Sequence, residues 1–231
     1  MDSSIAAPRV QGSATHLCLV MILCLWGLAC GFVAAGNLGI TEQMLDMVAA
    51  EYGRRARGII IDWQNVVDKH QNKSELEKLT LVNNFFNRNR FVSDLQHWKV
   101  VDYWATPIEF LSTKGGDCED FAIAKYVTLR ALDIPEEKLR ITYVKAIHLN
   151  QAHMVLTYYD SPRAIPLVLD NIDQSIKPAN KRLDLKPVYS FNGNGIWLAK
   201  MRGKGQKIGS ANDLNMWRDL VSRLNRERDS K

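Results

Sequence analysis

The thiol of Cys118 is the side chain of this sequence best suited to covalent chemistry. It stands in the run Gly115-Gly116-Asp117-Cys118-Glu119-Asp120, and the other three cysteines, Cys18, Cys24 and Cys30, share an apolar N-terminal stretch. Without that stretch, Cys118 has no partner for a disulfide and no companion ligands for a structural zinc site. A nucleophile needs no second copy, whereas a buried, inert cysteine is the alternative interpretation.

A histidine and an aspartate further along the chain could complete a catalytic set with Cys118. His153 begins one expected strand and Asp170 ends the next, with a turn at residues 160–163 between them. Because antiparallel pairing brings the start of one strand beside the end of the next, the two side chains can be cross-strand neighbours. Asp170 would then hold one imidazole nitrogen while the other faces the sulfur. The alternatives are an ordinary half-buried strand histidine and an aspartate that caps the following turn.

The carboxylates beside Cys118 oppose its ionisation, because nearby negative charge raises the pKa of a thiol. A hard divalent cation bound by Asp117, Glu119 and Asp120 would compensate, and oxygen ligands favour calcium. We therefore expect a calcium site on which activity depends. The three acids could instead be only the N-cap and first-turn acids that many helix starts carry. The sequence contains no twelve-residue EF-hand loop.

The start of a helix is expected to position Cys118. Asp117 is a suitable N-cap, and the apolar residues that follow predict a helix over residues 118–132, which ends before Pro135. Unpaired backbone N–H groups and the dipole at this helix start would stabilise a thiolate, and the backbone N–H of Cys118 could donate to an oxyanion. Further helices are expected over residues 44–52, 59–67, 74–86, 108–112 and 212–228.

The periodicity changes after residue 135, where β-branched and aromatic residues predict strands. The expected strands cover residues 141–147, 153–159, 165–170 and 195–200. Helices followed by an antiparallel sheet indicate an α+β fold. We expect one domain over residues 36–231, with a helical lobe at about 40–132, a sheet lobe at about 140–200 and a C-terminal helix at about 211–228.

Composition and charge agree with one globular domain. Of the 231 residues, 46% are hydrophobic and 24% are charged, as in ordinary globular proteins. The net charge of +5 includes arginine clusters at residues 54–57 and 223–228, which suit a solvated helix face or an acidic partner. The sequence has no basic motif interleaved with aromatic residues of the kind that binds nucleic acid, so nucleic acid is not an expected partner.

Residues 16–35 form an apolar stretch without charged side chains, which indicates export. Its end, Val33-Ala34-Ala35, has the small residues of a signal-peptidase site, so residues 1–35 are expected to be a cleaved signal peptide. An uncleaved N-terminal anchor is the main alternative, and Leu28-Ala29-Cys30 resembles a lipoprotein box without matching it fully. All three interpretations place the folded domain outside the cytoplasm.

Four blocks of sequence resemble a known family. Besides the run around Cys118, they are Tyr103-Trp104-Ala105-Thr106-Pro107 with Glu109-Phe110-Leu111, then Ala152-His153-Met154-Val155-Leu156, and Leu169-Asp170-Asn171. Over about residues 45–200 the chain is similar to the bacterial transglutaminase-like cysteine proteinases, and among them to the LapG-type periplasmic proteases.

The resemblance implies a papain- or transglutaminase-like core with a Cys-His-Asp triad. The triad would consist of Cys118, His153 and Asp170. The resemblance also implies calcium bound by acids that flank the cysteine, which correspond to Asp117 and Glu119, with Asp120 as a third. The implied substrate is the N-terminal region of a large repeat adhesin, cut at a di-alanine site in the periplasm, which frees the cell from its biofilm. An inner-membrane cyclic-di-GMP receptor of the LapD type would hold the protease in check.

Two other classes of function stay open at this point. A transglutaminase or a cell-wall amidase would use the same triad, because an acyl-thioester can be resolved by water or by an amine. A non-enzymatic module that only docks a partner would not need Cys118, His153 and Asp170 together. Cleavage of an adhesin fragment, incorporation of a primary amine, or neither, separates the three classes.

Overall fold

Polar caps set the starts of helices in the N-terminal half of the protein. The structure is a computed structural model that describes residues 37–198 and 205–229. Its first helices are α1 Glu42–Tyr52, α2 Arg54–His70, α3 Glu75–Phe86, α4 Asp94–His97, α5 Pro107–Thr113 and α6 Cys118–Ala131. Thr41, Ser74 and Thr106 each accept a backbone N–H from the helix that they precede, in capping boxes. These caps place α3 and α5 where the sequence predicts helices.

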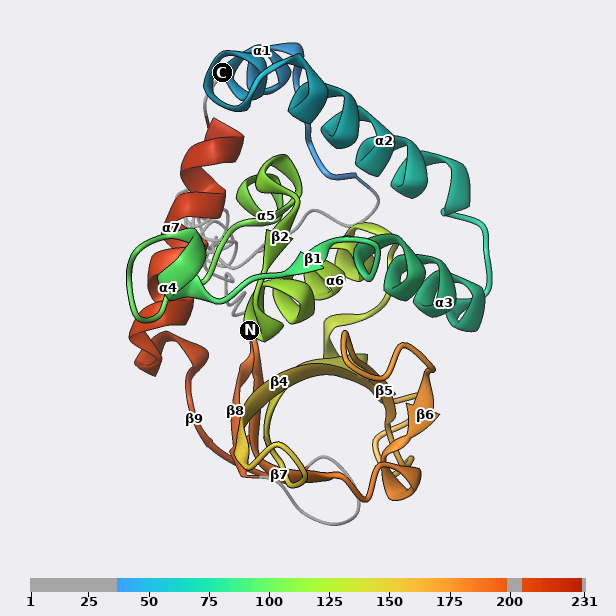
Figure 1. Ribbon diagram of the computed structural model, residues 1–231. Helices are drawn as coiled ribbons and strands as arrows, with labels where there is room; N and C mark the ends of the chain where they lie inside the picture. The colour runs from blue at the N-terminus through green and yellow to red at the C-terminus, as the bar shows by residue number, and fades with distance from the viewer. Residues whose placement is uncertain (1–36, 199–204, 230–231) are drawn as a thin grey trace, which may run out of the picture. The chain divides into compact units, whose positions relative to one another are not determined.

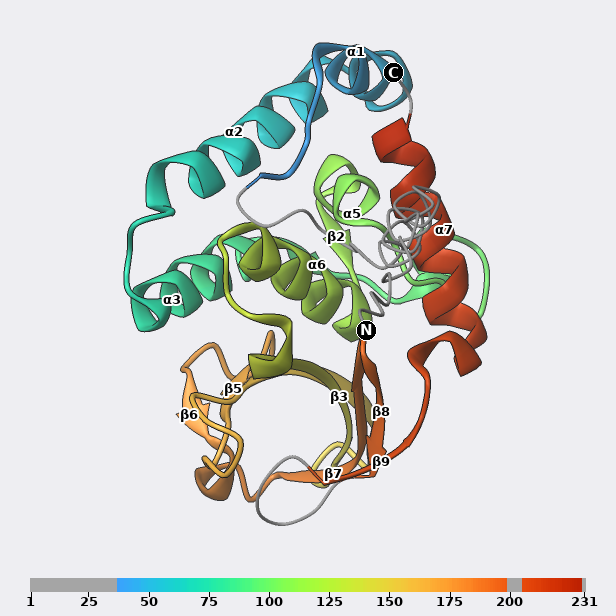
Figure 2. The same ribbon diagram turned by 180° about the vertical axis from the view of Figure 1, so that it is seen from behind.

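A curled antiparallel sheet follows the helices. Its strands are β3 Leu139–Ala146, β4 Gln151–Tyr158, β5 Leu167–Leu169, β6 Lys177–Pro178, β7 Leu185–Asn192, β8 Gly195–Leu198 and β9 Gln206–Gly209. The strand order is β6-β5-β4-β3-β7-β8-β9, and each neighbouring pair is antiparallel. The strands curve into an open ring beneath the helices (Figure 1), and the view from behind shows the same ring (Figure 2).

Three 3₁₀ helices, a C-terminal helix and a second, small sheet complete the fold of the described residues. The 3₁₀ helices are η1 Glu136–Lys138, η2 Ala179–Lys181 and η3 Ala211–Asp213, and the last helix is α7 Asn215–Asp229. A two-stranded parallel sheet pairs β1 Arg90–Phe91 with β2 Gly115–Gly116. Because β2 directly precedes α6, this small sheet fixes the point at which the cysteine-bearing helix begins.

Helix α6 lies at the centre of the hydrophobic core. It is buried on nearly all sides, as expected for a helix enclosed by other elements. The main core includes Ile123 of α6 together with Leu156 and Phe191 from the sheet, all of them fully buried. A smaller cluster contains Val144, Val155 and Val168. Side chains alternate between the two faces along a strand, so this cluster lies on the face of β4 opposite to Leu156.

The observed fold is the predicted α+β class, with some elements longer or additional. Helix α2 extends the helix expected at residues 59–67 in both directions. Strands β7 and β9 were not predicted: β7 contains Pro187 and is half exposed, and β9 has only four residues. The strand expected at residues 195–200 is β8 as far as Leu198. The expected signal peptide, residues 1–35, lies outside the described residues. Within the described ranges, no helix has both the length and the apolar character needed to cross a membrane.

Candidate active site

The turn before Cys118 is held by close backbone packing. The Arg90 N–H donates to the Lys114 carbonyl at 3.2 Å, and the Val92 N–H donates to the Gly116 carbonyl at 2.9 Å. A Cβ atom at position 116 would collide with the Asp120 carboxylate and with the ring of Phe110. Glycine is therefore required there, and the chain enters α6 along one fixed path.

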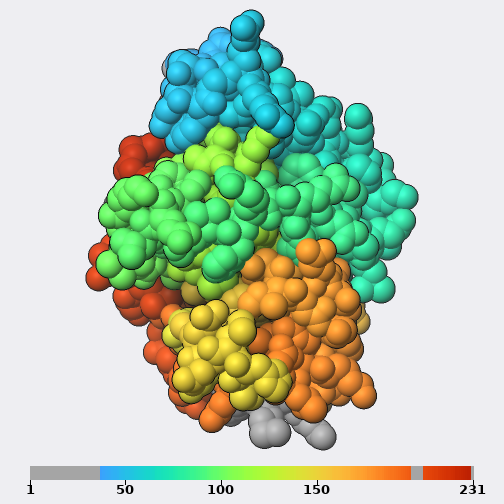
Figure 3. Space-filling model, in the orientation of Figure 1, coloured from blue at the N-terminus to red at the C-terminus, as the bar shows by residue number. Residues whose placement is uncertain are grey.

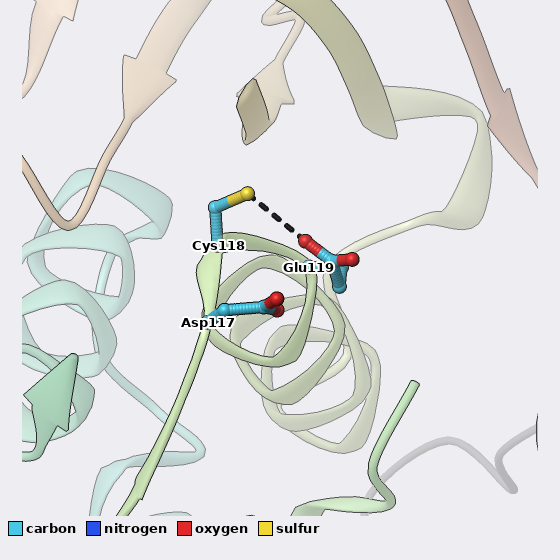
Figure 4. Close-up of side chains that lie close together, drawn as sticks. All are labelled: Asp117, Cys118 and Glu119. Carbon is cyan, nitrogen blue, oxygen red and sulfur yellow. Dashed lines mark hydrogen bonds between the residues drawn. The ribbon is translucent and has the colours of Figure 1, made fainter. Parts of the chain in front are cut away.

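The thiol of Cys118 lies partly buried at the first residue of α6. It donates a hydrogen bond to Glu119, with 2.9 Å between Sγ and Oε2 (Figure 4). Burial raises the pKa of this thiol above its usual range, and the charges of Glu119 and Asp117 raise it further. The backbone N–H of Met154, the residue after His153, acts in the opposite direction. The sulfur therefore lies beside β4, and its carboxylate neighbours favour the protonated thiol.

His153 and Asp170 form a buried pair. Nε2 of His153 lies 2.8 Å from Oδ1 of Asp170, and the two side chains are 2% and 0% exposed. The register aligns Leu156 with Leu169, so extending it places residue 155 opposite Asp170 and makes His153 a diagonal neighbour. With Nε2 bound to the carboxylate, Nδ1 is the imidazole nitrogen left for proton transfer. Among the hydrogen bonds of the residues that the structure describes, none joins this imidazole to Cys118.

The second oxygen of Asp170 contacts an arginine. Nη2 of Arg182 lies 2.7 Å from Oδ2 of Asp170, while Oδ1 also accepts the Ile172 backbone N–H at 3.0 Å. Burial by itself would raise the pKa of Asp170. The hydrogen bonds from His153, Ile172 and Arg182 outweigh that effect and hold the pKa well below its usual range. Asp170 is consequently an ionised carboxylate that orients the imidazole.

The backbone that carries Asp170 is tied to two helices. The Asp170 carbonyl accepts hydrogen bonds from Asn87 Nδ2 at 2.8 Å and from Lys125 Nζ at 3.1 Å. Asn87 follows α3, and Lys125 lies in α6 about two turns after Cys118, on the same side of the helix. Burial lowers the pKa of Lys125 to about 7, although the charge of Asp170 acts against this shift. The same helix therefore supports both the cysteine and the strand end that bears the aspartate.

Five acidic side chains gather beside the cysteine. Oxygen atoms of Asp94, Asp117 and Asp120 lie within 4.8 Å of one another, and so do those of Asp94, Asp102 and Glu119. Burial raises the pKa of Asp117 to about 10, with further contributions from Glu119, Asp120 and Asp94. It likewise raises the pKa of Asp94 to about 6 and that of Asp120 well above the usual value. The charged neighbours that shift the pKa values of Asp94, Asp117 and Asp120 are all carboxylates, so these side chains repel one another.

The cluster suits a hard cation. Oδ1 of Asp94 and Oδ1 of Asp117 are buried and have no hydrogen-bond partner, so two oxygens are left open to a metal. Asp120 is less open, because its oxygens accept the backbone N–H groups of Ala105 at 2.7 Å and of Asp117 at 3.2 Å. Carboxylate oxygens are the ligands that calcium prefers. The residues present therefore fit the calcium ion expected from the sequence.

The structure gathers the predicted residues and adds three more. Cys118 and the predicted ligands Asp117, Glu119 and Asp120 meet at the start of α6, and His153 with Asp170 lies at the adjoining end of β4 and β5. Asp94, Asp102 and Arg182 were missed. Asp102 directly precedes the block that begins at Tyr103, which was a usable signal. Nothing local in the sequence marks Asp94 or Arg182, because their roles depend on tertiary contacts.

Exposed apolar side chains occur on the segments around this site. Val101, before α5, is 90% exposed, and Phe91 and Leu95 near α4 are 58% and 64% exposed. Leu149 in the turn between β3 and β4 and Ile172 after Asp170 are each 53% exposed. In the space-filling view, the surface around α4 meets the surfaces of that turn and of the chain after β5 (Figure 3). A bound peptide would find both apolar and polar contacts on this face.

Comparisons with known proteins agree with this geometry. Residues 55–184 match a family described as bacterial transglutaminase-like cysteine proteinase. The chain is similar to the EGTA-treated structure of Legionella pneumophila LapG, with 40% sequence identity and a TM-score of 0.72 over 83% of this chain and 100% of that one. For the calcium-bound structure of Legionella pneumophila LapG, the identity is 43% and the TM-score 0.69, over 80% of this chain and 99% of that one. No curated protein sequence matches the chain significantly.

Proposed function

The chain belongs to the bacterial transglutaminase-like cysteine proteinases, which makes it a cysteine protease with a transglutaminase-like fold. On this premise we propose that it is a calcium-dependent endopeptidase of the periplasm that cleaves the N-terminal region of a large surface adhesin. The observation that carries the proposal is the hydrogen-bonded pair of His153 and Asp170 next to the helix start that presents Cys118.

The proposed mechanism is nucleophilic catalysis by the thiol. Cys118 attacks the scissile carbonyl while Nδ1 of His153 takes the thiol proton, and the backbone N–H of Cys118 donates to the developing oxyanion. His153 then gives the proton to the leaving amine, which leaves an acyl-enzyme at Cys118. Water, deprotonated by His153, releases the acyl group and restores the thiol. Asp170 keeps Nε2 occupied throughout, so that Nδ1 is the nitrogen that exchanges protons.

Calcium is the cofactor that the acid cluster fits. Asp117, Glu119, Asp94 and Asp102 would bind the ion. Asp120 would fix the backbone beside them, because its oxygens accept the Ala105 and Asp117 N–H groups. A bound calcium ion neutralises carboxylates that otherwise raise the pKa of the neighbouring thiol. One of the solved structures similar to this chain is calcium-bound LapG, which supports the choice of metal.

The substrate and the regulator follow from the sequence resemblance. We take the substrate to be a large repeat adhesin, cut at a di-alanine site so that the cell is released from its biofilm. The proposed regulator is an inner-membrane cyclic-di-GMP receptor of the LapD type, which sequesters the protease. Exposed apolar side chains such as Phe91, Leu95 and Val101 supply a surface on which a protein partner could dock.

Incubation with an adhesin N-terminal fragment tests the proposal. Cleavage at a di-alanine is expected with calcium, and loss of cleavage is expected with a chelator or with Cys118→Ala. The alanine variant should keep the wild-type circular dichroism spectrum, because the thiol is only partly buried. A primary amine is added in a parallel reaction. Amine incorporation without cleavage would replace the protease by a transglutaminase, and cleavage by Cys118→Ala would remove the nucleophile.

A further inference from the structure

We propose that Arg182 is a positioning residue for the reaction: its guanidinium fixes the carboxylate of Asp170 and, through it, the imidazole of His153. The inference rests on the proposed function of Cys118, His153 and Asp170 as a triad. Arg182 directly follows η2 and lies outside the sequence motifs and the expected strands. Its role emerges only from the contacts that it makes inside the fold.

The contact between Arg182 and Asp170 is shielded from water. The distance between Nη2 and Oδ2 is 2.7 Å, and the two side chains are 3% and 0% exposed. A charge-assisted hydrogen bond in such surroundings is stronger and more directional than one on the surface. The pair is therefore able to hold the plane of the carboxylate in one orientation.

Arg182 is itself held by Asp184, which binds the Nε and Nη2 edge of the guanidinium. Nε lies 3.0 Å from Oδ1 of Asp184, and Nη2 lies 2.7 Å from Oδ2 of the same residue. Asp173 is near as well, with its Oδ2 3.9 Å from Nε. The backbone is also fixed, because the Arg182 N–H donates to the Ala179 carbonyl and the Arg182 carbonyl accepts the Leu185 N–H, both at 3.1 Å. Both the backbone and the guanidinium of Arg182 are thus fixed by hydrogen bonds where the side chain meets Asp170.

Each oxygen of Asp170 consequently has an assigned partner. Oδ1 accepts from His153 and from the Ile172 N–H, and Oδ2 accepts from Arg182. The terminal torsion of an aspartate is broad, so a carboxylate with bonds to one oxygen only can turn. Arg182 prevents that turn. The imidazole is then kept with Nε2 toward Asp170 and with Nδ1 available.

The fork of an arginine is needed for this role. A guanidinium offers donors in a fixed plane and can bind Asp170 and Asp184 at once. A lysine at position 182 would keep the positive charge but would present a single flexible ammonium. Charge alone is therefore expected to restore folding without restoring the full rate. This difference separates a positioning role from a general contribution to stability.

The test compares Arg182→Gln and Arg182→Lys in the full chain with calcium present. Arg163→Gln, at an exposed position in the turn before β5, is the matched control. Two readouts are used: kcat and KM for the adhesin fragment, and the downfield proton resonance of His153 Nε2–H, which His153→Gln identifies by its loss. We expect kcat of Arg182→Gln to fall by up to about 100-fold with KM nearly unchanged, as a misplaced catalytic group would cause. Its Nε2–H resonance should shift or broaden.

The lysine variant decides the outcome if Arg182→Gln does not fold. A folded Arg182→Lys with reduced kcat and a shifted Nε2–H resonance supports the inference, whereas wild-type kcat and resonance in either variant overturn it. Asp170→Asn separates this result from the proposed function. If Asp170→Asn keeps full activity, the triad itself is wrong. If Asp170→Asn is inactive and Arg182→Gln is fully active, only the inference about Arg182 fails.

Discussion

Glu119 has two opposing relations to the thiol beside it. It accepts the thiol hydrogen bond at 2.9 Å and its charge contributes to the raised pKa of Cys118. It also lies with Asp94 and Asp102 in the group of acids that fits a cation. The same carboxylate therefore favours the protonated thiol while its negative charge is uncompensated, and it would help to hold the cation that compensates that charge. At the scale of single residues, metal binding and nucleophile activation are one electrostatic problem.

Glu119→Gln should change the reactivity of Cys118 in opposite directions with and without calcium. In chelator, loss of the negative charge lowers the pKa of the thiol, so alkylation by iodoacetamide at neutral pH should speed up by about tenfold, which corresponds to one pKa unit. In calcium, the variant should react more slowly than wild type because it binds the ion less well. The rates are measured by mass spectrometry. Equal rates for both proteins in chelator would contradict the role given to Glu119.

At the scale of elements, α7 fixes the segment of chain around Tyr103 and Trp104, which borders the acid cluster. Arg223 of α7 bonds Glu109 at 2.7 Å, contacts the Trp104 carbonyl, and lies over the ring of Tyr103, 4.6 Å from its centroid. The Tyr103 N–H in turn donates to Asp94 at 2.6 Å. The last helix, which lies beyond the matched family region of residues 55–184, is therefore linked to the candidate metal site through this segment.

Arg223→Gln should destabilise the protein by about 2 kcal/mol, the usual cost of losing hydrogen bonds to a charged group that is partly buried. The Arg223 side chain is 13% exposed and its partner Glu109 is 17% exposed, so little water can replace the lost contacts. Urea unfolding measures the difference. Arg218→Gln, which removes an exposed arginine of the same helix with only local partners, should change the free energy of unfolding by much less. Equal effects of both variants would show that Arg223 does not anchor α7.

Glu227 should make the docking of α7 sensitive to pH. Burial raises its pKa from 4.5 to about 7, and the hydrogen bond from Thr106 only partly offsets this shift. Because the folded value lies above the unfolded one, the contribution to stability is full below about pH 4.5 and is lost as pH rises through about 7.

Glu227→Gln should therefore be more stable than wild type at pH 8, and this advantage should shrink toward pH 5. The expected size is of the order of 1–2 kcal/mol, since one pKa unit corresponds to about 1.4 kcal/mol and the side chain is only partly shielded from water. Urea unfolding at several pH values measures it. A difference between the two proteins that stays constant from pH 5 to pH 8 would argue against a shifted Glu227.

The sequence predicts those features of the fold and site that depend on local chemistry. Ser74 and Asp117 mark helix starts because capping is a matter of neighbouring residues, and the turn after residue 159 pairs β4 with β5 for the same reason. The diagonal offset of His153 and Asp170 could not be predicted, because it depends on where the short strand β5 stops. Arg182 and Asp94 were missed since each meets its partners only after the sheet has curled and α4 has packed. The pair of His153 and Asp170 could thus be predicted from the sequence more easily than the residues that support it.

At the scale of the whole molecule, calcium should stabilise the fold. Asp94 and Asp102 belong to the chain between β1 and α5, whereas Asp117 and Glu119 belong to the start of α6. An ion bound by all four would connect these parts of the chain and remove the repulsion between buried carboxylates. At a concentration 100-fold above the dissociation constant, binding adds about 2.7 kcal/mol to the free energy of unfolding. For a protein of this size that corresponds to a rise in Tm of about 5–10 °C.

Asp117→Asn tests whether this stabilisation comes from the acid cluster. In chelator the variant should melt above wild type, because the pKa of Asp117 is raised to about 10. At neutral pH folding must therefore protonate a carboxylate that is ionised in the unfolded chain, which costs stability, and asparagine avoids this cost. In calcium it should lose most of the rise in Tm. Asp68→Asn, which removes an exposed carboxylate from α2, is the control and should respond to calcium like wild type. A calcium-induced rise of equal size in both variants would place the ion elsewhere, and the calcium dependence proposed for Cys118 would then need another explanation.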